Sequence, residues 1–306
     1  MAVARVRNQL LDAPAALPRE VVSHLVCVQA QDYLGALWAV GLRTRSASEA
    51  DVERALANRE IVRTFPLRGT LHFVAAEDVH WILDFLAPRV LRSRGPRQMR
   101  VHGLDAALLR RCRAVASRVL RGENALTREE LYREWRVPAE QGLQLIWRFS
   151  HEKLMCFGAR RGKQQTFVLL DEWIPSSRTI APADPLQELV RRYFASHGPA
   201  TPADFAWWAG VTPAEARSAH VEIPPSQARD VVRLLPPYDE FIAAYTDYKS
   251  KGDAVIVSRG AVVGTWKRTL TRSGVAVHVS PARALRAGEQ RALDREIARY
   301  AGFVTP

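Results

Sequence analysis

The chain has 306 residues, of which 47% are hydrophobic and 25% are charged, which is the balance of a globular protein with room for two or more domains. It contains no apolar run long enough to span a bilayer, no signal-like core near its start and only three scattered cysteines, so the composition argues against membrane proteins and disulfide-stabilised secreted domains. The net charge is +12, and only five of the 44 basic residues are lysine, which favours a polyanionic partner and predicts a cytoplasmic, nucleoid-associated protein.

The predicted elements alternate between helix pairs and short hairpins. The first part is predicted to hold three helices, a short strand and two further helices, at residues 18–28, 32–42, 51–63, 70–74, 76–94 and 104–121. A second part has Thr127 with Glu130 as a helix cap, followed by a second helix and a hairpin, at residues 127–135, 139–153, 154–158 and 166–170. A third part has helices that start near residues 185, 202 and 213. The last part is predicted to be four short strands and a closing helix, at residues 231–235, 254–259, 261–267, 275–279 and 284–301.

Two glutamines interrupt the first helical pattern. The apolar stripe of residues 18–28 would place position 29 against the core, where the sequence has Gln29. A buried amide must form hydrogen bonds, so Gln29 either binds the backbone or awaits a ligand. Gln31 can serve the same site only if the helix breaks, because residues i and i+2 point roughly 200° apart on an α-helix. Asp32 is predicted to cap the next helix, and the alternative interpretation is a simple polar junction between two helices.

Basic residues gather in two places. Residues 89–121 contain ten arginines and one acid, Asp105, and such a block predicts a surface that follows a phosphate backbone. The predicted hairpin at 154–170 carries Arg160, Arg161 and Lys163 at its tip. Helix pairs followed by a basic hairpin are the layout of a winged helix, so nucleic acid is the expected partner.

Motifs for cofactors are missing from the sequence. It has neither a Gly-rich phosphate loop nor the glycine fingerprint that follows a strand in dinucleotide-binding folds. His24 and Cys27 are three residues apart, but no second pair of ligands accompanies them. We therefore expect a protein that uses no cofactor and no metal.

Four motifs carry a resemblance to a known family. They are His24–Gln31, which ends in Gln-Ala-Gln; Arg63–His72; Leu235–Phe241; and Val263–Arg268. In this order, across nearly the whole chain, they resemble the AlkZ-like and YcaQ-like winged-helix DNA glycosylases. The related branch has Gln-aliphatic-Asp where this chain has Gln29 and Gln31, so the sequence is more similar to the AlkZ branch.

The resemblance implies an α+β fold of tandem winged-helix units in a C-shaped arrangement, with a small C-terminal β-barrel. We accordingly expect four regions: a first winged-helix unit with the catalytic motif and a helical extension, a second winged helix, a third winged helix, and the barrel with its closing helix, at residues 1–122, 123–182, 183–228 and 229–306. The implied activity is that of a monofunctional DNA glycosylase, which hydrolyses the N-glycosidic bond of N7- or N3-alkylated purines in double-stranded DNA. Bulky or interstrand-crosslinked adducts are possible substrates, and we expect a monomer.

The resemblance assigns catalysis to Gln29 and Gln31. A neutral amide is a poor general base, but an alkylated purine is cationic and leaves readily, so the enzyme mainly has to stabilise an oxocarbenium-like sugar and position a water. We expect Gln31 to orient the water and Gln29 to support the sugar or that water. Asp32 is the rival carboxylate.

Further residues of the motifs are candidates for binding DNA. The whole set of DNA-binding candidates is Arg63, Arg68, His72, Arg160, Arg161, Lys163, Tyr238, Asp239, Lys267 and Arg268. His72 is equally compatible with a packed, hydrogen-bonded histidine, and Glu240 with an internal polar network. The alternative function is a non-catalytic winged-helix DNA-binding protein or transcriptional regulator, which would bind repeated half-sites as a dimer.

Overall fold

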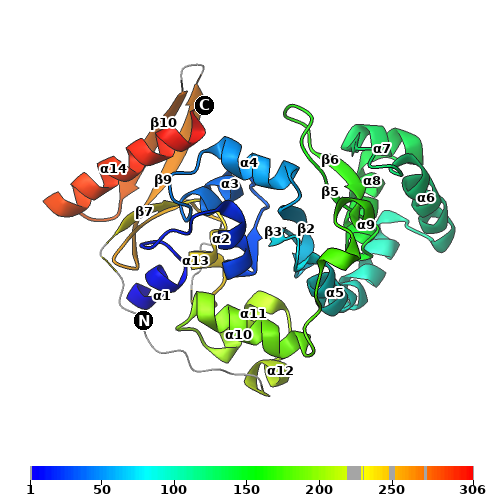
Figure 1. Ribbon diagram of the computed structural model, residues 1–306, viewed down its shortest axis with the longest axis horizontal. Coiled ribbons are helices and arrows are strands. Elements are labelled where there is room, and N and C mark those ends of the chain that lie inside the picture. The colour runs from blue at the N-terminus through cyan, green and yellow to red at the C-terminus, as the bar shows by residue number, and fades with distance from the viewer. Residues whose placement is uncertain (1, 219–228, 230, 248–251, 272–273, 306) are drawn as a thin grey trace. The chain divides into compact units, whose positions relative to one another are not determined.

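The computed structural model describes residues 2–218, 229, 231–247, 252–271 and 274–305 (Figure 1). The chain divides into two compact units, of which unit one is Met1–Ala55 with Leu186–Pro306, and unit two is Leu56–Pro185. These two units are defined by contacts and do not test the four regions predicted from the sequence, which stay a prediction. None of the helices in the described ranges has the length and apolar character that a membrane-spanning helix needs.

Unit one contains helices from both ends of the chain and one antiparallel sheet. Its helices are α1 (Ala2–Asn8), α2 (Pro18–Leu25), α3 (Tyr33–Gly41), α10 (Pro185–His197), α11 (Pro202–Ala209), α12 (Pro213–Ser218), α13 (Glu240–Ala243) and α14 (Ala287–Val304). Its strands are the short β1 (Cys27–Gln29), then β7 (Val232–Leu235), β8 (Val255–Ser258), β9 (Ala261–Thr271) and β10 (Gly274–Pro281). Helix α4 (Glu49–Ala57) lies at the boundary with unit two.

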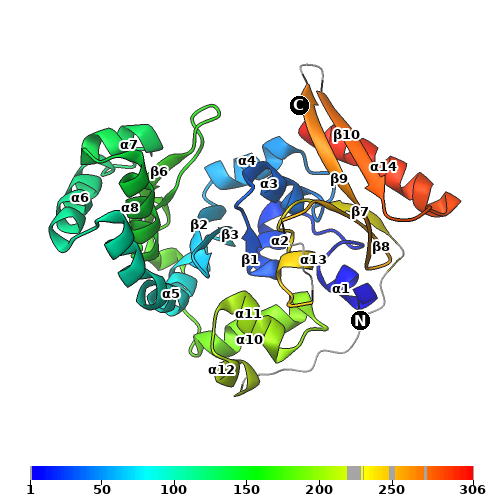
Figure 2. The same ribbon diagram turned by 180° about the vertical axis from the view of Figure 1, so that it is seen from behind.

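The sheet of unit one has the order β10-β9-β8-β7, and all its neighbours are antiparallel. Helix α14 packs along this sheet, as both views show (Figures 1 and 2). Trp38 of α3 and Trp266 of β9 each contact Tyr300 of α14 edge-on, at 5.0 Å between ring centroids. Their indole N–H groups donate to the neighbouring carbonyls of Leu234 and Leu235, at 2.6 and 2.8 Å. The bond from Trp38 fixes α3, and with it the residues just before it, on the edge strand β7, and the bond from Trp266 ties β9 to the end of β7.

Unit two has one sheet and a set of helices around an aromatic core. Its strands, in the order β3-β2-β5-β6-β4, are β2 (Ile61–Leu67), β3 (Thr70–Ala75), β4 (Leu126–Thr127), β5 (Met155–Phe157) and β6 (Thr166–Leu169). Its helices are α5 (Val79–His102), α6 (Ala106–Val119), α7 (Arg128–Trp135), α8 (Ala139–His151), α9 (Leu170–Trp173) and a 3-10 turn at Ser176–Arg178. Trp135, Phe149 and Phe167 lie fully buried between these helices and the hairpin β5–β6.

Three predicted helices differ from the structure. The helix predicted at 18–28 ends at Leu25, and the one predicted at 51–63 ends at Ala57 and is followed by β2. The helix predicted at 76–94, with an interruption or kink at Pro88, is one helix, α5, which runs from Val79 to His102 and includes Pro88 and Pro96. Burial of the first half of α5 stabilises the helix despite the backbone hydrogen bonds that a proline removes.

Candidate functional site

The segment with the two glutamines is extended. Helix α2 ends at Leu25, β1 follows at once and α3 begins only at Tyr33. Between α2 and β1, Val26 has φ +68° and ψ −52°, the values of a tight three-residue reversal. Positive φ at a β-branched residue is strained by on the order of 1–3 kcal/mol, and such strain is concentrated at functional sites. The break in the helix that the paired role of the glutamines requires is therefore present, and α2 ends three residues before the end of the helix predicted at 18–28.

Exposure alternates along the segment from Val28 to Gln31. Val28 and Ala30 are buried, whereas Gln29 is half-buried and Gln31 is exposed. Successive side chains of an extended chain point to opposite faces, and the strand β1 extends as far as Gln29. The simple helix–helix junction weighed from the sequence does not describe this segment, because β1 separates the helices.

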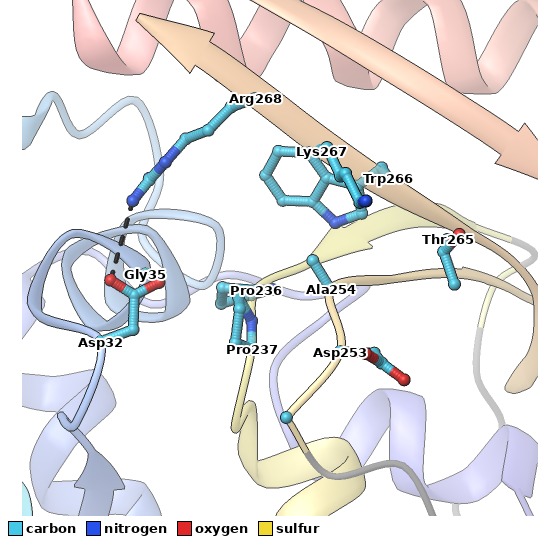
Figure 3. A pocket seen from close by; sticks show the side chains of 11 residues that line it. Asp32, Gly35, Pro236, Pro237, Asp253, Ala254, Thr265, Trp266, Lys267 and Arg268 are labelled. Carbon is cyan, nitrogen blue, oxygen red and sulfur yellow. Dashed lines mark ion pairs between the residues drawn. The ribbon is translucent and has the colours of Figure 1, made fainter.

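A pocket of about 440 Å³ opens next to Asp32, the residue that follows Gln31 (Figure 3). Apolar groups of Pro236, Pro237 and Trp266 form part of its wall, and its charged groups are Asp32, Asp253, Lys267 and Arg268. Figure 3 shows the Arg268 side chain reaching across the pocket toward Asp32, and these groups are 3.7 Å apart between Nη2 and Oδ1. The pocket therefore offers both apolar surface and cationic groups beside the glutamine segment.

Asp32 occupies the N-cap position of α3, as predicted, but its carboxylate makes no capping hydrogen bond to the backbone N–H groups that the structure describes. Its nearest charged partner is Arg268, whose other terminal nitrogen donates to the hydroxyl of Tyr300 at 2.7 Å. Lys267, the next residue back along β9, is exposed. The predicted cap therefore lacks its hydrogen bond, because the carboxylate faces the pocket.

Tyr238 and Asp239 precede α13. Tyr238 is half-buried and has φ +61°. Asp239 is buried and accepts two hydrogen bonds from Arg43, at 2.7 and 2.8 Å, and a third from the backbone N–H of Phe241. All the oxygens of this carboxylate are engaged inside the protein, so we omit Asp239 from the DNA surface proposed below. The role of Arg43 could not be predicted from the sequence, since a lone arginine near a helix end has no pattern that marks it as buried.

Arg63 lies on β2, Arg68 lies in the turn between β2 and β3, and His72 lies on β3. His72 is fully buried, with its Nδ1 at 2.9 Å from the carbonyl of Thr70, which matches the packed alternative for this residue. The Arg63 guanidinium lies 4.7 Å from the ring centre of Phe157, and only 7% of the residue is exposed. Arg68 has φ +50° at the turn and is half-buried. Of the three, Arg68 alone lies at a turn.

The basic tip of the hairpin is present between β5 and β6. Arg161 and Lys163 are exposed and Arg160 is half-buried. Arg161 donates hydrogen bonds to the Glu130 carboxylate at 2.8 Å and to the carbonyl of Ala125 at 2.6 Å. It therefore both stabilises the hairpin and contributes positive charge to it. Lys163 lies in the exposed turn between β5 and β6.

The arginine block of residues 89–121 lies on α5, on α6 and just after α6 in unit two. Several of these arginines form hydrogen bonds or ion pairs within unit two; Arg111, for example, donates to the carbonyl of Trp135 at 2.7 Å. Six others are exposed and form no ion pair with an acid in the described part of the chain: Arg92, Arg94, Arg97, Arg100, Arg110 and Arg121. This set of six is called the α5–α6 arginine set below.

Within the described residues no group of three or more His, Cys, Asp or Glu side chains could hold a metal ion. The three cysteines are buried and none of them forms a disulfide, and burial raises the pKa of the Cys156 thiol far above its ordinary value. A thiol in this state is neither a nucleophile nor a metal ligand.

The class of protein follows from comparison with known families. Residues 22–303 match the family described as DNA glycosylase AlkZ-like, so the chain belongs to this family. The resemblance inferred from the four sequence motifs is thereby confirmed.

Two relatives give the comparison detail. An interstrand DNA cross-link repair glycosylase from Streptomyces sahachiroi is 29% identical over 229 residues, which are 67% of this chain and 58% of that protein. The chain thus matches less than two thirds of the length of this curated relative. The solved structure of Streptomyces sahachiroi DNA glycosylase AlkZ aligns with a TM-score of 0.72, over 99% of this chain and 95% of that chain, at 20% identity. The fold of the chain is therefore similar to that of AlkZ.

Proposed function

We propose that this chain is a monofunctional DNA glycosylase that acts as a monomer on double-stranded DNA and hydrolyses the N-glycosidic bond of N7- or N3-alkylated purines. Bulky and interstrand-crosslinked adducts are included in the proposed substrate class. The observation that carries the proposal is that α2 ends at Leu25, before the two glutamines, and that Gln29 and Gln31 are both more exposed than their neighbours Val28 and Ala30. Membership of the AlkZ-like family and the name of the curated relative support it.

The proposed chemistry suits neutral amides. An N7- or N3-alkylated purine is cationic, so it leaves with its bonding electrons without prior protonation. The sugar then develops positive charge, which amide carbonyl oxygens stabilise, and a positioned water completes the hydrolysis. Gln31, the more exposed of the two, orients the water, and the half-buried Gln29 supports the sugar or that water.

DNA binding is proposed to use cations of each unit. In unit one these are the exposed Lys267 and the half-buried Arg268 at the pocket next to Asp32. In unit two they are the half-buried Arg160 and the exposed Arg161 and Lys163 of the hairpin, together with the α5–α6 arginine set. Tyr238 of unit one and Arg68 of unit two are half-buried and are further proposed contacts. Such contacts bind phosphate regardless of sequence, which is what repair of scattered lesions requires.

The helix and strand order of unit two supports the winged-helix interpretation. Helix α6, strand β4, helices α7 and α8 and the hairpin β5–β6 follow one another in the chain, and β4 pairs with β6. That is the order of a winged helix with a three-stranded wing. Helices α11 and α12 in unit one are joined by a turn at Gly210 with φ +70°, which is typical of helix-turn-helix motifs. We propose tandem winged-helix units on this basis. The four-stranded sheet is proposed to form the C-terminal β-barrel, with α14 as its closing helix.

The decisive experiment measures release of free base from duplex DNA that contains N7-methylguanine. The wild-type protein should release the base, and Gln29→Ala and Gln31→Ala should each lower the single-turnover rate constant, on the order of 100-fold together. Gln290→Ala is the matched control, because Gln290 lies on the exposed face of α14 and its side-chain amide donates to Asp294, at 2.9 Å. Full excision by the double variant would refute the site.

The same assay separates the alternative, a non-catalytic DNA-binding protein. That function predicts protection of one particular DNA sequence and no release of base from alkylated DNA. For binding itself, Lys267→Ala should reduce the slope of log K against log salt by about 0.9, as expected for one phosphate contact. Lys153→Ala should leave the slope unchanged, because Asp84 holds the Lys153 ammonium at 2.7 Å. Equal slopes for all three proteins would remove Lys267 from the DNA surface.

A further inference from the structure

The backbone of the glutamine segment is held by a buried carboxylate. Glu240, the first residue of α13, accepts a hydrogen bond at Oε1 from the backbone N–H of Gln29, at 2.9 Å. The two residues are 211 positions apart in the chain, and Glu240 is only 2% exposed. A carboxylate acceptor forms a stronger hydrogen bond than a neutral one, and more so where water is excluded.

Other buried groups fix this carboxylate in place. The indole N–H of Trp208 on α11 donates to Oε2 at 2.9 Å, and Nε2 of His197 on α10 lies 3.5 Å from the same oxygen. Trp208 and His197 are themselves at most 1% exposed, and the His197 ring stacks on Tyr193 with 4.7 Å between centroids. The acceptor that binds Gln29 is therefore rigid.

The residue before Glu240 anchors the far end of the same structural element. Asp239 binds Arg43, which lies two residues beyond α3, while Glu240 binds Gln29, which lies four residues before α3. The stretch from Gln29 to Arg43, with both catalytic candidates at its start, is thus held at both ends by two neighbouring carboxylates. Neither carboxylate side chain reaches solvent.

We propose that Glu240 is the positioning residue of the catalytic segment, and that Trp208 and His197 orient Glu240. Glu240 touches neither substrate nor water, and it acts by fixing the Gln29 backbone and hence the direction of both glutamine side chains. This inference rests on the proposed function. Misplacement of a catalytic group by about 1 Å costs on the order of 100-fold in rate. Loss of the hydrogen bond from the Gln29 N–H to Glu240 should therefore lower the excision rate measurably.

Glu240→Gln is the informative variant, because it keeps the size of the side chain and removes one of its two acceptors. Its single carbonyl can accept from Gln29 or from Trp208, and the amide NH2 then faces the other N–H donor. Trp208→Phe removes the competing donor, so Glu240→Gln combined with Trp208→Phe restores an acceptor for Gln29. We expect Glu240→Gln to lower the single-turnover excision rate at least about 10-fold, with unchanged affinity for undamaged duplex. The double variant should recover to within about fivefold of the wild type.

Glu296→Gln is the matched control, since Glu296 is a buried carboxylate of the same unit that binds Arg233 at 3.4 Å and lies on α14. This variant should lower the melting temperature but leave the excision rate within about twofold. If Glu240 were merely structural, Glu240→Gln would likewise lower the melting temperature and leave the excision rate nearly unchanged. Adding Trp208→Phe would then lower the melting temperature further and would not restore the excision rate. Either result would overturn the inference.

Amide hydrogen exchange provides a readout that does not depend on catalysis. In Glu240→Gln the Gln29 amide should exchange faster, whereas the amides of β8 and β9 should keep their protection. If the wild type releases no base but the Gln29 amide responds in this way, the proposed function fails and the anchoring stands. If excision by the wild type depends on Gln29 and Gln31 but the amide does not respond, the inference about Glu240 fails alone.

Discussion

Removal of the Asp239 carboxylate should destabilise unit one strongly. All the N–H groups of the Arg43 guanidinium point at acceptors: Nε at the carbonyl of Gln9 (2.9 Å), Nη1 at the carbonyl of Ala39 (2.9 Å) and at Asp239 (2.8 Å), Nη2 at the Gln9 side chain (3.0 Å) and at Asp239 (2.7 Å). Neither side chain of the ion pair is exposed. In Asp239→Asn the guanidinium stays buried while the carboxylate that forms its ion pair is lost.

The magnitude follows from the cost of an unpaired buried charge. Breaking such a pair costs about 3–5 kcal/mol. For a unit of this size each kcal/mol shifts the melting temperature by roughly 2–4 °C, so the expected decrease is roughly 6–20 °C. Replacing both partners by apolar residues, as in Arg43→Met with Asp239→Leu, should cost less than Asp239→Asn alone, because no charge is then left buried.

Differential scanning calorimetry of the variants measures this effect, with urea unfolding as a second probe. Asp247→Asn is the control, because Asp247 forms an ion pair with Arg5 at 3.4 Å but its side chain is 59% exposed. An exposed pair contributes no more than about 1 kcal/mol. A decrease below about 2 °C for Asp239→Asn, or equal effects of the two Asp→Asn substitutions, would refute the energetic reasoning.

Two further predictions concern stability. Burial lowers the pKa of His151 to about 4 from an unfolded value near 6.5, so the unfolded state takes up a proton that the folded state does not. The stability of unit two should be full above pH 6.5 and decrease by about 3 kcal/mol toward pH 4, and urea unfolding of His151→Phe across this range should lack that part of the slope. Gly41→Ala should destabilise by about 1–3 kcal/mol, because an added Cβ would lie 2.1 Å from the Phe303 ring, whereas Gly302→Ala, with nothing within 4 Å, should be neutral or stabilising in thermal melts.

Local chemistry explains the parts of the fold that the sequence predicted well. The Thr127–Glu130 cap forms with both reciprocal hydrogen bonds, at 3.3 and 2.7 Å, and the helix it starts ends at Trp135 as predicted. Thr201 and Asp204 form a second cap of the same kind. Ser258–Ala261 is the predicted turn between β8 and β9, with positive φ at Arg259 and Gly260. In each case the interacting groups are within a few residues of one another, so the pattern is visible in the sequence.

The strands β1 and β2 could not be predicted in this way. In β2, Arg63 and Thr64 are polar but buried, so the strand lacks the alternation that marks a half-exposed one. Pro66 lies where the register of β2 against β3 shifts, between Thr64 and Leu67, which is how a proline is accommodated within a sheet. Local propensity favours a helix up to residue 63, but pairing with β3 and β5 makes residues 61–67 a strand.

The glutamine segment shows where prediction of a functional site stops. Two amides at positions 29 and 31 imply a break in the helix, and that break is found. One group that holds the segment is Glu240, with Trp208 and His197 behind it, and no spacing in the sequence connects these residues to Gln29. An amide side chain carries no net charge, so its direction depends mainly on its hydrogen bonds and on the backbone that carries it. An active site built from amides therefore depends on its backbone being fixed, and a buried, charge-assisted hydrogen bond to that backbone is the strongest single means available to the fold.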